Sequence, residues 1–323
     1  MERLKKAARA LGLTLLCAWL FGAVWFDGPL TIGKGNALLA LFWAGLLFAA
    51  RFTPKPRLAR ALLVLLVLVP WLTIRPSNDR DWKPEFARTG WSEIDGDRVT
   101  LHEVRNFDYT PEGGVTERWE SRTVHLSNLR GIDLFLDAFM GDWVAHPILS
   151  FDFGPDGRLC LSVETRRERA ESFSMFGGLY KMFELQYLFG DERDFIRVRT
   201  NIRREPVYLY RLSGKPDTWR AFFLDSLDTQ NSLKSQPRYY NVITANCTTS
   251  LRTNQPRNLR GHFDIRLLLN GKLDEMLFER RAINHQGLTF PELRRRSFIT
   301  PEAQAAHDDP AFSERIRATV PGG

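Results

Sequence analysis

A cysteine, a histidine and a carboxylate are the residues of this chain whose types and spacing could perform nucleophilic catalysis. Cys247 follows the turn-like run 237–241 and a short extended piece, and we expect a helix to begin at it. Unpaired backbone N–H groups and the helix dipole at such a position favour the thiolate. If His146 reached Cys247, the pair would form an activated nucleophile, with Glu164 orienting the imidazole.

A β-hairpin over residues 146–167 would bring the histidine and the carboxylate together. Its turn, residues 154–157, reads Gly-Pro-Asp-Gly and suits a three-residue loop that pairs Gly154 with Arg158. In that register the apolar residues of both strands share one face, and the even-numbered, mostly polar residues share the other. His146 then lies opposite Arg166 and diagonal to Glu164. Asp152 is on the same face and is an alternative partner for the histidine.

Less specific readings of these residues stay open. A lone cysteine is commonly a small buried apolar residue, and Cys160 could form a disulfide with Cys247. A histidine on a strand is commonly structural. The remaining histidines are scattered without the spacing of metal ligands, so we expect no metal and no cofactor; they are His102, His125, His262, His285 and His307.

The excess of basic over acidic residues is confined to the N-terminal part of the chain. The formal net charge is +7, from 45 Lys and Arg against 38 Asp and Glu. Residues 1–75 hold ten of the basic residues and two of the acidic ones, which leaves 35 basic and 36 acidic residues for the rest. A nucleic-acid-binding domain would carry the basic excess itself, so no nucleic-acid partner is expected.

Three apolar runs in the first 75 residues predict transmembrane helices at about 7–25, 30–50 and 58–74. The first run is longer than the apolar core of a cleaved signal peptide, and it lacks the small residues that precede a cleavage site. Basic residues flank the start of the first run and fill the loop between the second and third, so both sites should be cytoplasmic. We therefore expect a membrane anchor over residues 1–75, a linker over 76–84, and an extracytoplasmic domain over 85–323.

The exported part alternates between strand-like and helix-like patterns. Residues 98–104 and 122–126 read as strands, and residues 217–235 read as a helix capped by Asp217. We expect an α+β domain without internal repeats.

Several blocks in this domain resemble the Lnb-type lipoprotein intramolecular transacylases, through their N-terminal periplasmic domain. The similar blocks occur in order between about residues 84 and 255; they are 104–109, 145–147 with 150–153, 162–168, 192–200, and 239–241 with 246–249. The order of a histidine on a strand and then a cysteine at a helix start is also similar to the permuted papain-like (NlpC-like) fold.

The resemblance implies an acyltransferase that works through a thioester intermediate. It implies Cys247 as the nucleophile, His146 as the base and Glu164 as the third member, with Asp152 as the rival. Arg166, Tyr240 and Asn246 would support the substrate or the oxyanion. The substrate would be a lipid or lipoprotein in the outer leaflet of the membrane.

Two other functions remain open. The same residues could serve a periplasmic cysteine peptidase or amidase that acts on cell-wall peptide, with water as acceptor. The domain could also be a non-catalytic binding or structural module with a buried Cys247. An apolar groove from Cys247 toward the membrane would favour the acyltransferase, and a polar cleft would favour the hydrolase.

Overall fold

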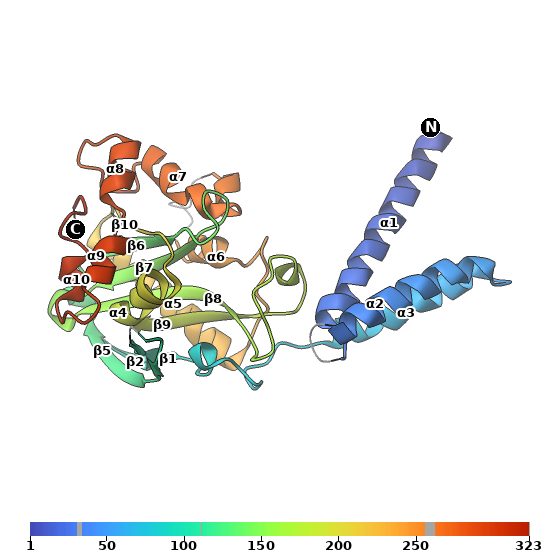
Figure 1. Ribbon diagram of the computed structural model, residues 1–323, viewed down its shortest axis with the longest axis horizontal. Helices are drawn as coiled ribbons and strands as arrows, with labels where there is room; N and C mark the ends of the chain where they lie inside the picture. The colour runs from blue at the N-terminus through green and yellow to red at the C-terminus, as the bar shows by residue number, and fades with distance from the viewer. Residues whose placement is uncertain (31–33, 111, 256–261, 323) are drawn as a thin grey trace.

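A computed structural model describes residues 1–30, 34–110, 112–255 and 262–322. Figure 1 shows three long helices on one side, with α1 at an angle to the α2–α3 pair, and a domain with a central sheet on the other, joined by the segment that follows α3. The two parts correspond to the apolar first 75 residues and to the mixed remainder of the sequence.

Three N-terminal helices are long and apolar enough to cross a membrane. They are α1 (Glu2–Asp27), α2 (Lys34–Ala49) with the 3-10 turn that extends it to Phe52, and α3 (Pro56–Thr73), close to the predicted ranges. Trp43 of α2 is buried and its indole N–H donates to the Leu63 carbonyl of α3 at 3.0 Å. This tryptophan therefore packs between helices.

The domain is built on one mixed sheet, in agreement with the predicted α+β class. The strand order is β1-β2-β9-β8-β7-β6-β10, and β5 also pairs with β2. Only the β2–β9 pair is parallel among the described strands of this sheet. The strands are β1 (Trp91–Asp95), β2 (Arg98–Arg105), β5 (Trp119–His125), β6 (Gly131–Asp137), β7 (His146–Asp152), β8 (Arg158–Arg166), β9 (Glu184–Asp191) and β10 (Val207–Arg211), with a separate small pair β3 (Asp108–Tyr109) and β4 (Val115–Thr116).

Helices cover both faces of this sheet. The larger core gathers odd-numbered residues of β7 and β8, such as Phe151 and Leu161, against Phe223 of α5. The smaller core gathers Ile148 and Cys160 against α4, α9 and α10. The even-numbered face is therefore buried, contrary to the expected polar face. The helices are α4 (Glu192–Arg197), α5 (Pro216–Ser235), α6 (Cys247–Thr253), α7 (Leu273–Glu279), α8 (Phe290–Arg296), α9 (Thr300–Ala305) and α10 (Phe312–Arg315).

The β7–β8 hairpin has the predicted faces but a different register. Leu149 pairs with Leu161 and Asp152 with Arg158, two residues away from the predicted pairing. The loop is 154–156, because Gly154 already adopts a positive φ of 56° and the Phe153 N–H donates to the Gly157 carbonyl. A shift of two residues keeps each side chain on its face. Continued outward, this register brings Glu164, instead of Arg166, level with His146.

Two local predictions need correction. The helix α5 begins at Pro216 with Lys215 at the N-cap position, so Asp217 lies in the first turn and is not the cap. The linker over residues 76–84 also packs on the domain, since Asn78 accepts a hydrogen bond from Arg166 and Trp82 lies under the Arg166 guanidinium.

Candidate active site

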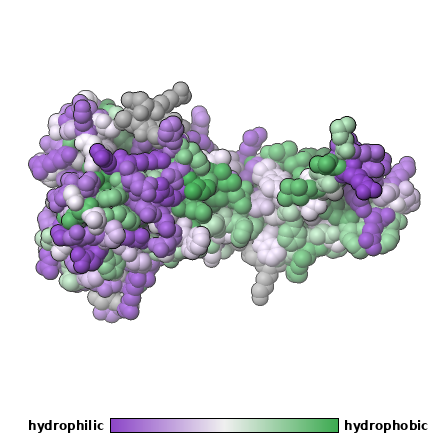
Figure 2. Space-filling view, turned by 90° about the horizontal axis from the view of Figure 1, so that it is seen from above, coloured by the Kyte–Doolittle hydropathy of each residue, from purple (hydrophilic) through white to green (hydrophobic). Residues whose placement is uncertain are grey.

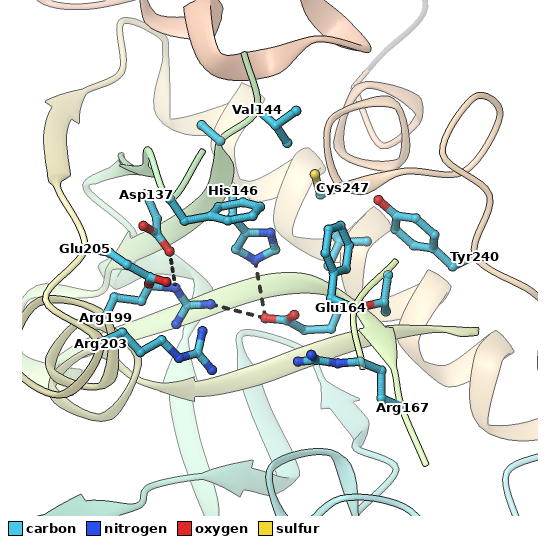
Figure 3. Close-up of a pocket in the computed structure, with 15 residues that line it drawn as sticks. Asp137, Val144, His146, Glu164, Arg167, Arg199, Arg203, Glu205, Tyr240 and Cys247 are labelled. Atoms are coloured by element: carbon cyan, nitrogen blue, oxygen red, sulfur yellow. Dashed lines mark hydrogen bonds and ion pairs between the residues drawn. The ribbon is translucent and has the colours of Figure 1, made fainter. Parts of the chain in front are cut away.

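A pocket of about 260 Å³ opens where β6 ends, β7 begins and β8 ends (Figure 3). One wall is apolar and the other is charged. Four of the sequence-predicted site residues line it, namely His146, Glu164, Tyr240 and Cys247. The apolar wall includes Phe139, Val144, Ala145, Val163 and Phe173, and the charged wall includes Asp137, Arg167, Arg199, Arg203 and Glu205.

His146 and Glu164 are linked through one ring nitrogen. His146 Nε2 lies 3.3 Å from Glu164 Oε1 and 2.6 Å from the Ser162 hydroxyl oxygen. The Ser162 hydroxyl in turn donates to Glu164 Oε1 at 2.6 Å. Because Nε2 is engaged in this way, Nδ1 is left on the side of Cys247 (Figure 3).

The electrostatics of this pair favour an ion pair. Burial lowers the pKa of His146, but the Glu164 charge and hydrogen bonds to Cys247 and Glu164 outweigh it and raise that pKa to about 9. Burial raises the pKa of Glu164, yet the charge and hydrogen bond of His146, the Arg199 charge and the Ser162 hydrogen bond hold that pKa well below its usual range. At neutral pH the imidazole is therefore protonated.

Cys247 is the first residue of α6, as predicted. Asn246 caps this helix: its side chain accepts from the Thr249 N–H at 2.7 Å, and Thr249 Oγ1 accepts from the Asn246 N–H in return. This reciprocal capping box fixes the first turn of a short helix. The Cys247 side chain is 7% exposed and lies at the pocket.

Tyr240 approaches the same cysteine from the preceding segment. Burial, the Cys247 charge and the Glu164 charge raise the pKa of Tyr240 well above its usual value, although a hydrogen bond from the Cys247 N–H opposes this. The phenol therefore keeps its proton. Figure 3 shows its hydroxyl directed toward the space beside Cys247.

Asn270 is a site residue that the sequence analysis missed. Its Nδ2 donates to Cys247 Sγ at 3.4 Å and to Thr248 Oγ1 at 2.9 Å, while its Oδ1 accepts from the Ala145 N–H at 2.9 Å. The Asn270 side chain thus connects Ala145, the residue before β7, to Cys247, the first residue of α6. The next residue, Gly271, packs so closely against the backbone of residues 142–143 that a larger side chain at this position would clash. The Asn-Gly pair was the available signal, but such pairs usually mark ordinary turns.

Ser162 and Arg199 are two further contacts that the sequence analysis did not assign. Arg199 is 5% exposed; its Nη2 donates to Glu164 Oε1 and its Nε lies 3.3 Å from Asp137 Oδ2. Asp137 also interacts with Glu205, whose pKa is raised to about 7, first by burial and then by the Asp137 charge. A chain of alternating charges therefore runs from His146 through Glu164 and Arg199 to Asp137 on the charged wall.

Three predicted site residues lie outside this arrangement. Arg166 donates to the carbonyls of Phe86 and Ala87 and to Asn78, so its donors are used by the linker and the first residues of the domain. Asp152 is at the other end of β7, where it pairs with Arg158 and Arg211. Asp152 therefore does not contact His146, and the prediction that it is the alternative partner of the histidine is wrong. The Asn246 amide donates to the Val242 carbonyl within its capping arrangement and is not a pocket residue.

The cysteines of the domain are not joined. Cys160 and Cys247 are free, and they belong to the cores on opposite faces of the sheet. The disulfide alternative is therefore wrong. In the described parts of the chain no group of three His, Cys, Asp or Glu side chains is arranged to hold a metal ion.

Comparison with known proteins gives one match. Residues 115–271 match the family model described as the Lnb N-terminal periplasmic domain. This range includes His146, Glu164, Tyr240, Cys247 and Asn270. No curated protein and no solved structure matches the chain.

Proposed function

This chain belongs to the Lnb-type family through residues 115–271, and from this premise we propose that it is a membrane-anchored cysteine acyltransferase. Its substrate is a lipid or lipoprotein acyl ester outside the cytoplasm, and the acyl group passes through a thioester on Cys247. The observation that carries the proposal is the meeting of Cys247, His146 and Glu164 at one pocket with an apolar wall.

The first half-reaction forms the thioester. His146 holds the proton of the Cys247 thiol, and the thiolate attacks the ester carbonyl carbon. The tetrahedral intermediate collapses as the carbon–oxygen bond to the leaving alcohol breaks. The imidazolium gives its proton to that oxygen, so the alcohol leaves neutral and His146 is left as a neutral base.

The second half-reaction moves the acyl group to an amine. The amine nitrogen attacks the thioester carbonyl, and neutral His146 takes the proton that the nitrogen loses. The carbon–sulfur bond then breaks, an amide forms, and the imidazolium–thiolate pair is restored. Glu164 touches the imidazole and not the substrate, so we assign it a positioning role that it shares with Ser162 and Arg199.

Two donors beside the sulfur are suited to the oxyanion of the tetrahedral intermediate. One is the Tyr240 hydroxyl, which keeps its proton, and the other is the Asn270 amide, which donates toward Sγ. Donors that are fixed before the reaction stabilise developing charge without the cost of reorienting solvent. Asn246 has no place in this assignment.

We also propose a permuted papain-like arrangement for the catalytic domain. A strand carrying the histidine precedes a helix that begins at the cysteine, and α6 lies against β7 and β8. We assign the anchor to the bacterial inner membrane with the N-terminus in the cytoplasm and the domain in the periplasm. The distribution of basic residues around the three helices supports this orientation.

Conversion of a defined lipopeptide tests the function. Full-length protein in detergent or vesicles is incubated with a diacylglyceryl lipopeptide that has a free N-terminal amine, and the products are weighed. We expect one acyl chain to move to the amine without change in total mass, and a fragment ion to carry it. Cys247→Ala should abolish this conversion and Cys160→Ala should not. Conversion that survives in Cys247→Ala would sink the proposal.

The charged wall of the pocket keeps a hydrolase as the second candidate. Asp137, Arg203 and Glu205 could bind a polar peptide, and water could replace the amine as acceptor. In the same experiment a hydrolase releases free fatty acid or cleaves peptide, with a gain of one water. Unaltered substrate with wild-type protein would instead favour a non-catalytic module.

A further inference from the structure

The long connection between β8 and β9 leaves the domain and contacts the ends of the membrane helices. The Lys181 N–H donates to both carboxylate oxygens of Asp27, and its ammonium donates to the carbonyls of Trp71 and Ile74 at 2.7 and 3.1 Å. Tyr180 stacks on Phe26 and on Trp19 of α1. These contacts tie residues 180–181 to α1 and α3.

These contacts also fix the level of the connection relative to the membrane. Asp27 is the last residue of α1, and α3 ends at Thr73, so Lys181 lies where both apolar spans end. Tryptophan and tyrosine are typical of this interfacial level. Tyr180 reaches further along α1, where Gly22 leaves room for its hydroxyl. The neighbouring residues of the connection are therefore held beside the outer leaflet.

The same region carries large exposed apolar side chains, which we call the apolar lip. Residues 172–180 contain no charged side chain. Phe176 is 71% exposed, and Trp143 in the connection between β6 and β7 is 73% exposed. Figure 2 shows hydrophobic surface on the part of the domain that lies beside the helices. The lip consists of Phe139, Met140 and Trp143 from one connection and Phe173, Met175, Phe176 and Leu179 from the other.

The apolar lip is continuous with the pocket. Phe139 and Phe173 contact each other with ring centroids 6.1 Å apart, and both line the pocket that holds Cys247. Exposed apolar surface of this extent marks an interaction site. Because the lip borders the ends of α1 and α3 on one side and the pocket on the other, a lipid bilayer is the occupant that fits it.

We propose that the apolar lip enters the outer leaflet and opens the pocket to the acyl-chain region of the membrane. An acyl chain then reaches Cys247 along Phe173 and Phe139 without crossing water. The inference that the lip enters the membrane depends on the contacts of residues 180–181 with α1 and α3 and on the exposed apolar side chains. The delivery of an acyl chain for reaction rests on the proposed function. A second copy of the chain, or a protein partner, is the competing occupant of the lip.

Photolabelling from within the bilayer tests membrane entry. Full-length protein is reconstituted in vesicles of phosphatidylethanolamine and phosphatidylglycerol that contain a phospholipid with a diazirine on its acyl chain. After irradiation, we expect label on peptides that cover residues 139–143 and 173–179, as well as on the three helices. Ile94 in β1 and Val115 in β4 are 50% and 54% exposed and belong to neither connection of the lip, so their peptides are the control. Label confined to the helices, or equal on the control peptides, would overturn the proposal. Lip-to-lip cross-links between copies that replace the lipid label would assign the lip to a second copy.

Matched variants separate the lip from catalysis. Phe176→Asp should lose the label at the lip and lower turnover of a vesicle-embedded ester by about tenfold, because a charged side chain opposes entry into hydrocarbon. Turnover of a water-soluble short-chain thioester should stay unchanged. Ile94→Asp should alter neither. Cys247→Ala should keep the label while both activities vanish, so a failed lip and a failed nucleophile give different results. Equal loss by Phe176→Asp on both substrates would contradict acyl-chain delivery.

Discussion

At the scale of single residues, the site depends on which groups share a proton. His146 faces Cys247 on one side and both Ser162 and Glu164 on the other, so its charge is stabilised from two directions. The arrangement gives Glu164 a task that Asp152, at the far end of the same strand, could not perform. Charge stabilisation of the imidazolium is the physical basis of the first prediction.

The first prediction concerns pH. Burial lowers the pKa of His146, but the Glu164 charge is the main cause that raises it to about 9. In the proposed mechanism the imidazolium must supply a proton to the leaving alcohol. We therefore expect kcat/KM to fall above about pH 9 in wild-type protein. Glu164→Gln removes the negative charge, which lowers the pKa of His146 and moves this alkaline limb to lower pH. Activity near neutral pH should drop by roughly 10²–10⁴-fold.

A pH profile distinguishes this positioning role from a structural one. Glu164→Gln also leaves the buried Arg199 with a neutral acceptor in place of a carboxylate, so some loss of thermal stability is expected. A merely unstable variant would lose activity without displacement of the limb. An unmoved alkaline limb in a folded Glu164→Gln protein would show that another group controls the histidine.

The second prediction concerns the oxyanion. Tyr240→Phe removes the hydroxyl beside Cys247 and should lower kcat by roughly 10²–10³-fold, the cost of one lost oxyanion donor. Tyr187→Phe is the control, because that buried hydroxyl bonds Asn254 and does not line the pocket. Comparable losses in both variants would indicate a packing effect and would remove Tyr240 from the oxyanion assignment.

At the scale of elements, three local features hold the proposed catalytic groups in place. The Asn246 and Thr249 capping box fixes the start of α6, and Asn270 connects that start to the residue before β7. The hairpin loop at residues 154–156 sets the register that brings Glu164 level with His146. Small changes in any of these would move the sulfur relative to the imidazole.

The third prediction tests the cap. Asn246→Ala should destabilise the protein by about 1 kcal/mol and lower the midpoint of thermal unfolding. Asn246→Asp keeps an acceptor for the Thr249 N–H and should recover most of that loss. If both variants retain wild-type stability, the capping box does not hold α6, and the fixed position of Cys247 needs another explanation.

The sequence predicted which face of the hairpin each residue occupies, but not which residues pair. Alternation in a strand has a period of two, so a shift of two residues leaves every apolar side chain in the core. The glycine at position 154 decided the register, because its positive φ starts the loop one residue early. The start of α6 was predictable, since polar residues that cap helices are local signals.

Contacts between distant segments could not be predicted in the same way. Asn270 reaches Cys247 and Ala145 only because the chain returns to the pocket after α6, and no local pattern encodes that return. Arg166 was misjudged for the same reason. Its nearest partners, Asn78 and Phe86, come from the linker and the start of the domain. The burial of the even-numbered face likewise depends on helices near the C-terminus.

At the scale of the whole molecule, the chain separates a basic, apolar anchor from a nearly neutral domain. The two parts are in contact through residues 180–181 and the ends of α1 and α3. Tyr180 occupies the space that Gly22 leaves on α1, so the anchor contributes to the position of the domain. A pocket held near the membrane in this way suits a substrate that never leaves the bilayer.

The fourth prediction concerns topology. Reporter fusions after Pro56 and after Trp82 should fall on opposite sides of the membrane, because α3 lies between them. The fusion after Pro56 should be active with a cytoplasmic reporter, and the fusion after Trp82 with a periplasmic one. Reporters on the same side would contradict three membrane-crossing helices, and reversed sides would contradict a periplasmic domain.

The acyl-enzyme is the most direct measure of the central claim. Full-length protein is mixed with an acyl ester substrate in the absence of an amine acceptor, quenched in acid, digested and weighed. We predict a mass increment equal to one acyl chain on the peptide that contains Cys247, removed by neutral hydroxylamine and missing in Cys247→Ala. Active protein that turns over substrate without ever carrying that increment, or that carries it on Cys160 or on a hydroxyl group, would contradict a thioester at Cys247.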